Sequence, residues 1–420
     1  MSGAVITVMA GLIVCYALVA RRLTLANVTA PMLSVVAGLV FFSASSVDIN
    51  ADFVHAVAEV TLVIILFHDA STVRFNQLRH DPGIALRLLA IGFPLALLAT
   101  CLLAGSLLPA LGVSGAWLIA AAITPTDAGL GAPTVLNPVV PLRVRRGLNV
   151  ESGLNDGLAT PIVLMALGVL AEREHAPIPG LLGIGVLSVL LALGCAIVLA
   201  WVTAWLLDRS RHRHFSGRRG RQIATLFLPA VLFGVAELIG ANAFIAAFVG
   251  GLVFGAASTT LAEEHETADL LETAADLLGF VVWFLFGGLM LLVFADGLKW
   301  QWVVIAVLAL TVLRVLPVAL AMIGTGFQWR TVVFLGWFGP RGLATIVFGL
   351  LALDELGPSS PFIDDLGGVM AVTVILSVFA HGLSSGPLSN VYGEWVKRTN
   401  APIGVEPSVE PMTTRGRTGH

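Results

Sequence analysis

The stretch ESGLNDG, residues 151–157, places two carboxylates, a serine and an asparagine within a long apolar segment. Residues four apart share a helix face, so Ser152 is expected beside Asp156 and Glu151 beside Asn155. A carboxylate next to a hydroxyl offers the hard oxygen ligands that suit a small cation. Asp156 is therefore the candidate for a group that binds a proton and a cation in turn.

Glu151, on the adjacent face, is instead placed to pair with a buried arginine. Two arginines fall within later apolar segments, Arg314 and Arg341, and the spacing leaves open which of them is the partner. An arginine partner favours the ionised form of a carboxylate, so a paired glutamate gives up its role in proton exchange. We expect Glu151 to belong to a structural ion pair that neutralises it in the membrane.

Two further acids lie near breaks or ends of apolar segments. Asp127, in the sequence TPTD, follows Pro125 and either caps the helix that resumes there or binds the ion directly; we favour the cap. Asp69, in ILFHDAS, is either an ion ligand or an interface charge, and the sequence does not decide between them. His68 and His381 lie at segment ends, where interfacial polarity explains them.

The elements that must position these residues are membrane helices. Of the 420 residues, 57% are hydrophobic and 12% are charged, whereas soluble domains carry about 25% charged residues. The apolar residues form thirteen blocks near the length that crosses a bilayer as a helix. The alternating strands of about 10 residues that a barrel requires are not seen. The blocks run over roughly 3–20, 29–46, 52–68, 84–108, 113–136, 147–170, 180–207, 222–239, 241–257, 273–295, 301–323, 331–353 and 366–386.

Charge in the connections predicts the orientation. Cations follow blocks 1, 3, 5, 7 and 11 and the last block, and the other connections hold almost none. The positive-inside rule then places the N-terminus outside and the C-terminus in the cytoplasm. The first block precedes Arg21 and Arg22, the reverse of a secretory signal, so we expect a retained span. The connection AEEHETADLLE is acidic and breaks the pattern. His212 and His214 fit a solvated basic loop better than a metal site.

Two blocks are the most interrupted by helix breakers. Proline and glycine crowd the middle of block 113–136 and the first half of block 331–353. Each is the fifth block of one half of the chain, which predicts two inverted repeats with an ion site between discontinuous helices. We expect repeat 1 over about 1–170, a linking span over about 180–207 and repeat 2 over about 222–386. Residues 1–399 form one transmembrane domain, and residues 400–420 form a disordered tail.

Three motifs in this order carry a resemblance: TPTD in a broken span, ESGLNDG opening the next span, and GPRG in the later broken span. With LFHDAS before them, they resemble the NhaP-type monovalent cation:proton antiporters of the sodium/proton exchanger family. The resemblance implies that Asp156 binds cation or proton, that Asn155 shapes the site, and that Ser152, Thr126 and Asp127 contribute to it. It implies a bridge from Glu151 to Arg341, and it maps Asp69 to an acidic site residue.

The expected protein is an all-α antiporter of the plasma membrane that exchanges Na⁺, or K⁺ or Li⁺, for protons. The Na⁺ ligands would be Asp156, Ser152 and Thr126. The resemblance also implies a homodimer with a six-helix ion-carrying core. We expect no enzymatic activity, no cofactor and no nucleic-acid partner; the three cysteines stand alone in apolar blocks, without metal or redox spacing. The alternatives are a sodium-coupled symporter of an organic anion and a polytopic membrane enzyme.

Overall fold

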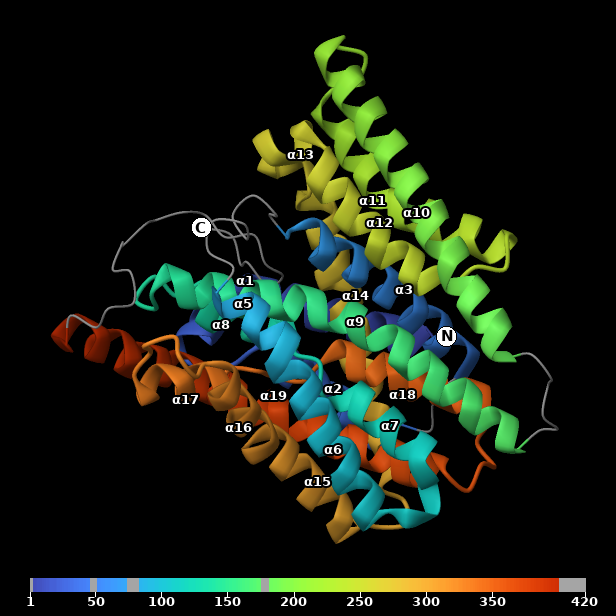
Figure 1. Cartoon of the computed structure of the whole chain (residues 1–420), viewed down its shortest axis with the longest axis vertical. Helices are drawn as coiled ribbons and strands as arrows, with labels where there is room; N and C mark the ends of the chain where they lie inside the picture. The colour runs from blue at the N-terminus through green and yellow to red at the C-terminus, as the bar shows by residue number, and fades with distance from the viewer. Residues whose placement is uncertain (1–2, 46–50, 74–82, 175–180, 400–420) are drawn as a thin grey trace.

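The chain folds entirely into helices over the residues that the computed structural model describes, which are 3–45, 51–73, 83–174 and 181–399 (Figure 1). This confirms the expected all-α class. The helices are α1 (Gly3–Leu25), α2 (Ala30–Ala44), α3 (Ala51–Ser71), α5 (Gly83–Arg87), α6 (Phe93–Leu107), α7 (Gly112–Ile123), α8 (Ala128–Val135), α9 (Leu142–Glu174), α10 (Leu181–His212), α11 (Arg218–Leu238), α12 (Ala243–Ala257), α13 (Thr259–Glu263), α14 (Asp269–Val293), α15 (Trp300–Leu310), α16 (Val312–Ala321), α17 (Trp329–Trp337), α18 (Leu343–Leu356) and α19 (Ile363–Thr399).

The expected apolar blocks correspond in order to these helices or to pairs of them. Ten helical stretches in the described ranges are long and apolar enough to cross a membrane, and α2 and α12 are shorter apolar helices. The chain is therefore a multi-pass membrane protein. The boundary of the last block is wrong, because α19 continues through polar residues to Thr399. The predicted disordered tail, residues 400–420, lies outside the described residues.

The two predicted interruptions are present, between α7 and α8 and between α17 and α18. Two others were not predicted. A π-helical turn at Leu88–Gly92 precedes α6, where Pro94 lacks the N–H that a regular turn would use. Helices α15 and α16 are separated at Thr311, whose φ of −118° and ψ of −93° leave the helical region. Its hydroxyl donates to the Val307 carbonyl, a bond that competes with regular helix geometry.

The helices pack in two groups (Figure 1). One, the α3 group, contains α2, α3 and α10–α14. The other, the crossing group, contains α5–α9 and α15–α19. The two meet where α3 packs against α9 and α18. Each group draws helices from both expected repeats, whose boundaries remain a prediction.

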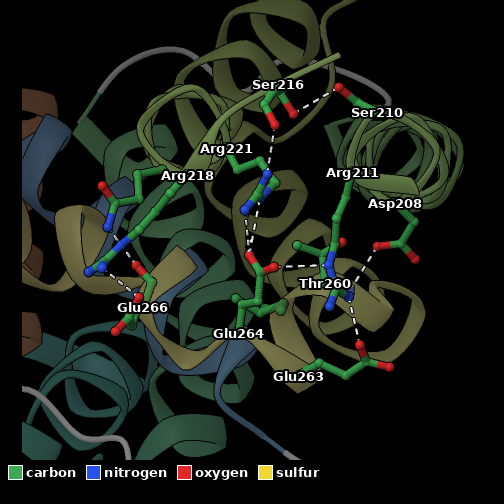
Figure 2. Close-up of polar contacts among 12 residues, drawn as sticks. Asp208, Ser210, Arg211, Ser216, Arg218, Arg221, Thr260, Glu263, Glu264 and Glu266 are labelled. Carbon is green, nitrogen blue, oxygen red and sulfur yellow. Dashed lines mark hydrogen bonds and ion pairs between the residues drawn. The ribbon is translucent and has the colours of Figure 1, made fainter. Parts of the chain in front are cut away.

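A polar cluster explains the acidic connection that broke the charge pattern (Figure 2). Arginines of the α10–α11 turn pair with acids between α12 and α14, so the basic and acidic connections lie at the same end of the bundle. The topology predicted from charge requires them to share one side of the membrane. His212 and His214 are exposed in this turn, as expected. The pairs are Arg211 with Glu263 and Glu264, Arg221 with Glu264, and Arg218 with Glu266 and Asp269.

Candidate ion-binding site

The two interrupted helices cross at their breaks. We call residues 124–127 the first break and residues 338–342 the second break. The Asp127 N–H donates to the Pro340 carbonyl at 2.7 Å, which joins the two breaks directly. The Thr345 hydroxyl of α18 donates to the Ala122 carbonyl of α7 at 2.7 Å. Backbone groups freed by one break are therefore satisfied by the other helix, as burial at membrane depth requires.

Asp127 caps both half-helices that begin at the crossing. Its Oδ1 accepts from the N–H groups of Gly129, at 2.7 Å, and Leu130, at 3.1 Å, in α8. Its Oδ2 accepts from the Leu343 N–H in α18 at 2.8 Å. Gly342 leaves room for this carboxylate, because a Cβ there would overlap Oδ2. The sequence left two roles open for Asp127, and the structure shows it as a helix cap.

Helix α9 brings its polar residues against the first break. The hydroxyls of Thr126 and Ser152 share a hydrogen bond of 2.8 Å, and Asn155 Nδ2 donates to Thr126 Oγ1 at 2.7 Å. All three side chains are buried. The expectation that Ser152 and Asn155 lie on separate faces is incomplete. They are three apart, so both can reach one threonine.

Asp156 follows in the next position of α9 and is 4% exposed. Its carbonyl accepts from the Thr160 hydroxyl at 2.8 Å, which satisfies a backbone group of the helix rather than the carboxylate. The next residue, Gly157, packs directly on the Phe248 ring of α12. The carboxylate therefore lies in the interior of the protein, in the turn that also carries Ser152 and Asn155.

Glu151 forms a bidentate ion pair with Arg314 of α16. Arg314 Nη2 donates to Glu151 Oε2 at 2.7 Å, Arg314 Nη1 donates to Oε1, and both side chains are 2% exposed or less. The bridge to Arg341 that the resemblance implied is therefore wrong for this chain. Because α16 restarts after Thr311, its first turn carries Arg314 up to α9. The unpredicted break in block 301–323 therefore places Arg314 where it pairs with Glu151.

Arg341 belongs instead to the second break. Its Nη1 donates to the Gly339 carbonyl at 2.9 Å, and its backbone N–H donates to the Ser377 hydroxyl at 2.6 Å. It is 1% exposed and lies within Coulombic range of Arg314, Glu151 and Asp156. Its charge thus acts on the site without the direct bridge that was expected.

The end of α3 reaches the same turn of α9. The Asp69 carbonyl oxygen would be 3.1 Å from a Cβ on Gly153, so the two backbones are in close contact. Asp69 Oδ1 lies 3.0 Å from His68 Nδ1, and both residues are buried. His68 and His381 are each 1% exposed, so both are buried within the protein, which the sequence did not indicate. The apolar helices that cover them come from distant parts of the chain.

Sequence reasoning missed Ser377 and His381 of α19, which contact the second break, and Thr345. Breaker residues alone indicate where backbone groups are freed, and not which side chains satisfy them. Among the described residues no group of three or more His, Cys, Asp or Glu side chains is arranged to hold a metal ion. The site therefore combines carboxylate, hydroxyl and amide groups.

Comparisons with known proteins identify similar sequences and a similar fold. A Na(+)/H(+) antiporter of Schizosaccharomyces pombe is 24% identical over 315 residues, covering 68% of this chain and 67% of that protein. Na(+)/H(+) antiporter 2 of Zygosaccharomyces rouxii is 24% identical over 377 residues, covering 74% and 46%. The chain thus spans about two thirds of the first relative and less than half of the second.

The structure of the sodium proton antiporter MjNhaP1 from Methanocaldococcus jannaschii at pH 8 has the same fold. It superposes with a TM-score of 0.72 over 96% of this chain and 99% of that chain, at 20% identity. The sequence model of the family described as "Sodium/hydrogen exchanger, transmembrane" matches residues 8–391, which is most of the chain. The protein therefore belongs to the transmembrane sodium/hydrogen exchanger family.

Proposed function

We propose that the protein is a secondary active antiporter that exchanges a monovalent cation for protons, with Na⁺ the first candidate and K⁺ or Li⁺ the alternatives. The observation that carries the proposal is a buried hydrogen-bonded cluster. Thr126 of the first break bonds to Ser152 and Asn155, which lie in the same turn of α9 as Asp156. Membership of the exchanger family supports it. The relatives' names give no support to the symporter alternative.

The cluster has the oxygen chemistry that a small hard cation requires. Asp156 would supply the charge, and the hydroxyls of Ser152 and Thr126 would supply neutral ligands. Asn155 Oδ1 is a buried oxygen for which the described residues provide no hydrogen-bond donor, so a bound cation would satisfy it. Asp69, whose backbone contacts Gly153, is a further candidate ligand.

Glu151 and Asp127 have other tasks in this scheme. The guanidinium of Arg314 occupies both carboxylate oxygens of Glu151, and three backbone N–H groups occupy Asp127. Asp156 then cycles alone between a proton and a cation, so the carrier has the same charge in both states. Exchange is expected to be one for one and electroneutral. Protons and cations compete for the same oxygens, so the apparent cation affinity falls as the pH drops.

The test uses the purified protein in vesicles with a trapped pH dye. Wild type should couple proton movement to a sodium gradient equally well with and without a potassium–valinomycin clamp. Asp156→Asn should abolish exchange while the protein stays folded, because an amide does not ionise. If an imposed membrane potential drives sodium-coupled proton movement, the single-carboxylate scheme is wrong.

The setting of this activity is also proposed. We place the protein in the plasma membrane as a homodimer, without enzymatic activity, with the N-terminus outside and the C-terminus in the cytoplasm, where it would contribute to pH homeostasis. A cysteine introduced in the 209–221 turn should label only from the cytoplasmic side. Labelling from outside alone would overturn this orientation. Crosslinking in native membranes tests the dimer.

A further inference from the structure

Helix α19 carries two buried polar residues that the proposed ion site does not use. Ser377 and His381 are four apart, so they share a helix face, and they are 0% and 1% exposed. Polar side chains at this depth remain buried only where they are hydrogen-bonded. Ser377 contacts Arg341 in the second break, and His381 contacts Trp337, the residue directly before it.

The two residues hold the two ends of this break. His381 Nε2 lies 3.0 Å from the carbonyl oxygen of Trp337, the last residue of α17. A carbonyl only accepts, so this contact is a hydrogen bond in the tautomer that carries the hydrogen on Nε2. At the other end, the Arg341 N–H donates to Ser377 Oγ at 2.6 Å. His381 Nδ1 contacts Ser377 through the hydroxyl, at 3.2 Å, and the carbonyl, at 3.0 Å, which links the two anchors.

The residues between these anchors touch the site. The Pro340 carbonyl accepts from the Asp127 N–H. A Cβ on Gly339 would lie 3.0 Å from Thr126 Cγ2 and 2.6 Å from Arg314 Nε. The middle of the second break thus packs against a proposed ion ligand and against the partner of Glu151. A shift of this backbone would move both.

We infer that Ser377 and His381 are positioning residues for ion exchange: they fix the second break and so set the place of Thr126 and Asp127 at the site. The inference rests on the proposed function, because it concerns the cation affinity of that same site. Neither residue needs to touch the ion, and neither needs to change its protonation state.

A neighbouring residue of α19 provides a matched control. Thr373 lies one turn before Ser377, is 0% exposed, and donates to the Val369 carbonyl of its own helix at 2.7 Å. Thr373→Val removes a buried hydroxyl from the same helix without touching the second break. Any effect specific to positioning should therefore appear in Ser377→Ala and be missing in Thr373→Val.

The experiment measures sodium-driven proton movement in vesicles over a range of sodium concentrations. Ser377→Ala and His381→Leu should raise the half-saturating sodium concentration about five- to tenfold, the effect of one lost hydrogen bond. The maximal rate should change less than that, because sodium in excess still fills the site. Ser377→Thr keeps the hydroxyl, and His381→Gln keeps an N–H for the Trp337 carbonyl. Both should restore most of the affinity.

One result would overturn the inference: Ser377→Ala melts at the wild-type temperature, and its half-saturating sodium concentration equals that of wild type and of Thr373→Val. It is also overturned if maximal rate and melting temperature fall together and the conservative variants restore neither, since that is a structural role alone. If His381→Leu does not fold, Ser377→Ala still tests the inference, because it removes only one oxygen atom. Failure of the proposed function is separate: wild type would then show no proton movement coupled to Na⁺, K⁺ or Li⁺, or Asp156→Asn would retain that movement.

Discussion

The two broken helices both carry proline and glycine at the interruption but are stabilised in different ways. The first break ends in Asp127, a carboxylate that caps its own helix α8. The second break ends in Gly342, whose backbone has φ −150° and ψ −129° and which has no side chain to cap α18. Its backbone N–H groups bond to side chains from elsewhere. The Leu343 N–H donates to Asp127 of the first break, and the Arg341 N–H donates to Ser377 of α19. One carboxylate therefore serves two half-helices, and the second break depends on its neighbours.

This difference separates two functions within one crossing. The first break supplies its own helix cap and contributes Thr126 to the ion cluster. The second break contributes backbone groups and the charge of Arg341, and its position is set from outside. Changes that remove or displace the shared cap should therefore damage both helices, whereas loss of the Ser377 hydroxyl should affect mainly the second break.

The largest effect is expected for Asp127→Ala. It leaves three backbone N–H groups at two helix starts without a partner, and each bond to a charged acceptor contributes about 1.5–3 kcal/mol. The variant should lose about 5 kcal/mol or fail to fold. Thermal melting in detergent measures this loss.

Asp127→Asn sharpens the same test, because one amide oxygen can cap only one of the two helices. It should fall between wild type and Asp127→Ala in melting temperature. An alanine variant that melts like wild type would rule out the shared cap.

The next effect concerns the pair that lies beside the second break. Glu151→Ala or Arg314→Ala leaves a buried charge without its partner, which costs about 3–5 kcal/mol. The double variant should lose less than the sum of the two single variants. The same cycle between Glu151 and Arg341 should be closer to additive, since Arg341 bonds the Gly339 carbonyl instead. A stronger coupling to Arg341 than to Arg314 would contradict the pairing.

The glycines at the crossing test the two breaks separately. Gly342→Ala places a Cβ on the Asp127 carboxylate and should cost about 1–3 kcal/mol. Gly131→Ala in α8 meets only Pro340 Cγ, at 3.9 Å, and should stabilise that helix by up to about 1 kcal/mol. Melting temperatures of the two variants give the comparison. If both variants shifted the melting temperature equally and in the same direction, the two breaks would not differ as proposed.

The sequence was sufficient for features that depend on local chemistry. Apolar block length predicted the helices, and the breakers around Pro125 and Pro340 predicted both interruptions. The ESGLNDG motif was predicted to lie within a helix, as it does in α9. Each of these features follows from residues close together in the chain.

Features that depend on contacts between distant segments were not predictable in this way. The choice of Arg314 over Arg341 depends on the break at Thr311, which the composition of that block does not indicate. The burial of His68 and His381 depends on which helices cover them. Both histidines end apolar stretches, and the sequence does not show that another helix packs there.

The smallest effect is expected far from the crossing, in the polar cluster between the α10–α11 turn and the acidic connection (Figure 2). Arg218 and Glu266 form a 2.6 Å pair in which the side chains are 55% and 61% exposed, whereas the Glu151–Arg314 side chains are 1% and 2% exposed. Water screens the exposed pair, so Arg218→Gln should cost about 0.2–1 kcal/mol at low salt. Raising the salt from about 0.05 M to about 0.5 M should erase that cost, because the Debye length falls well below 10 Å. The loss in Glu151→Ala should persist at both salt concentrations, since a buried charge is shielded from the added ions. If the two losses respond equally to salt, the Glu151–Arg314 pair is accessible to solvent ions and is not buried beside the crossing.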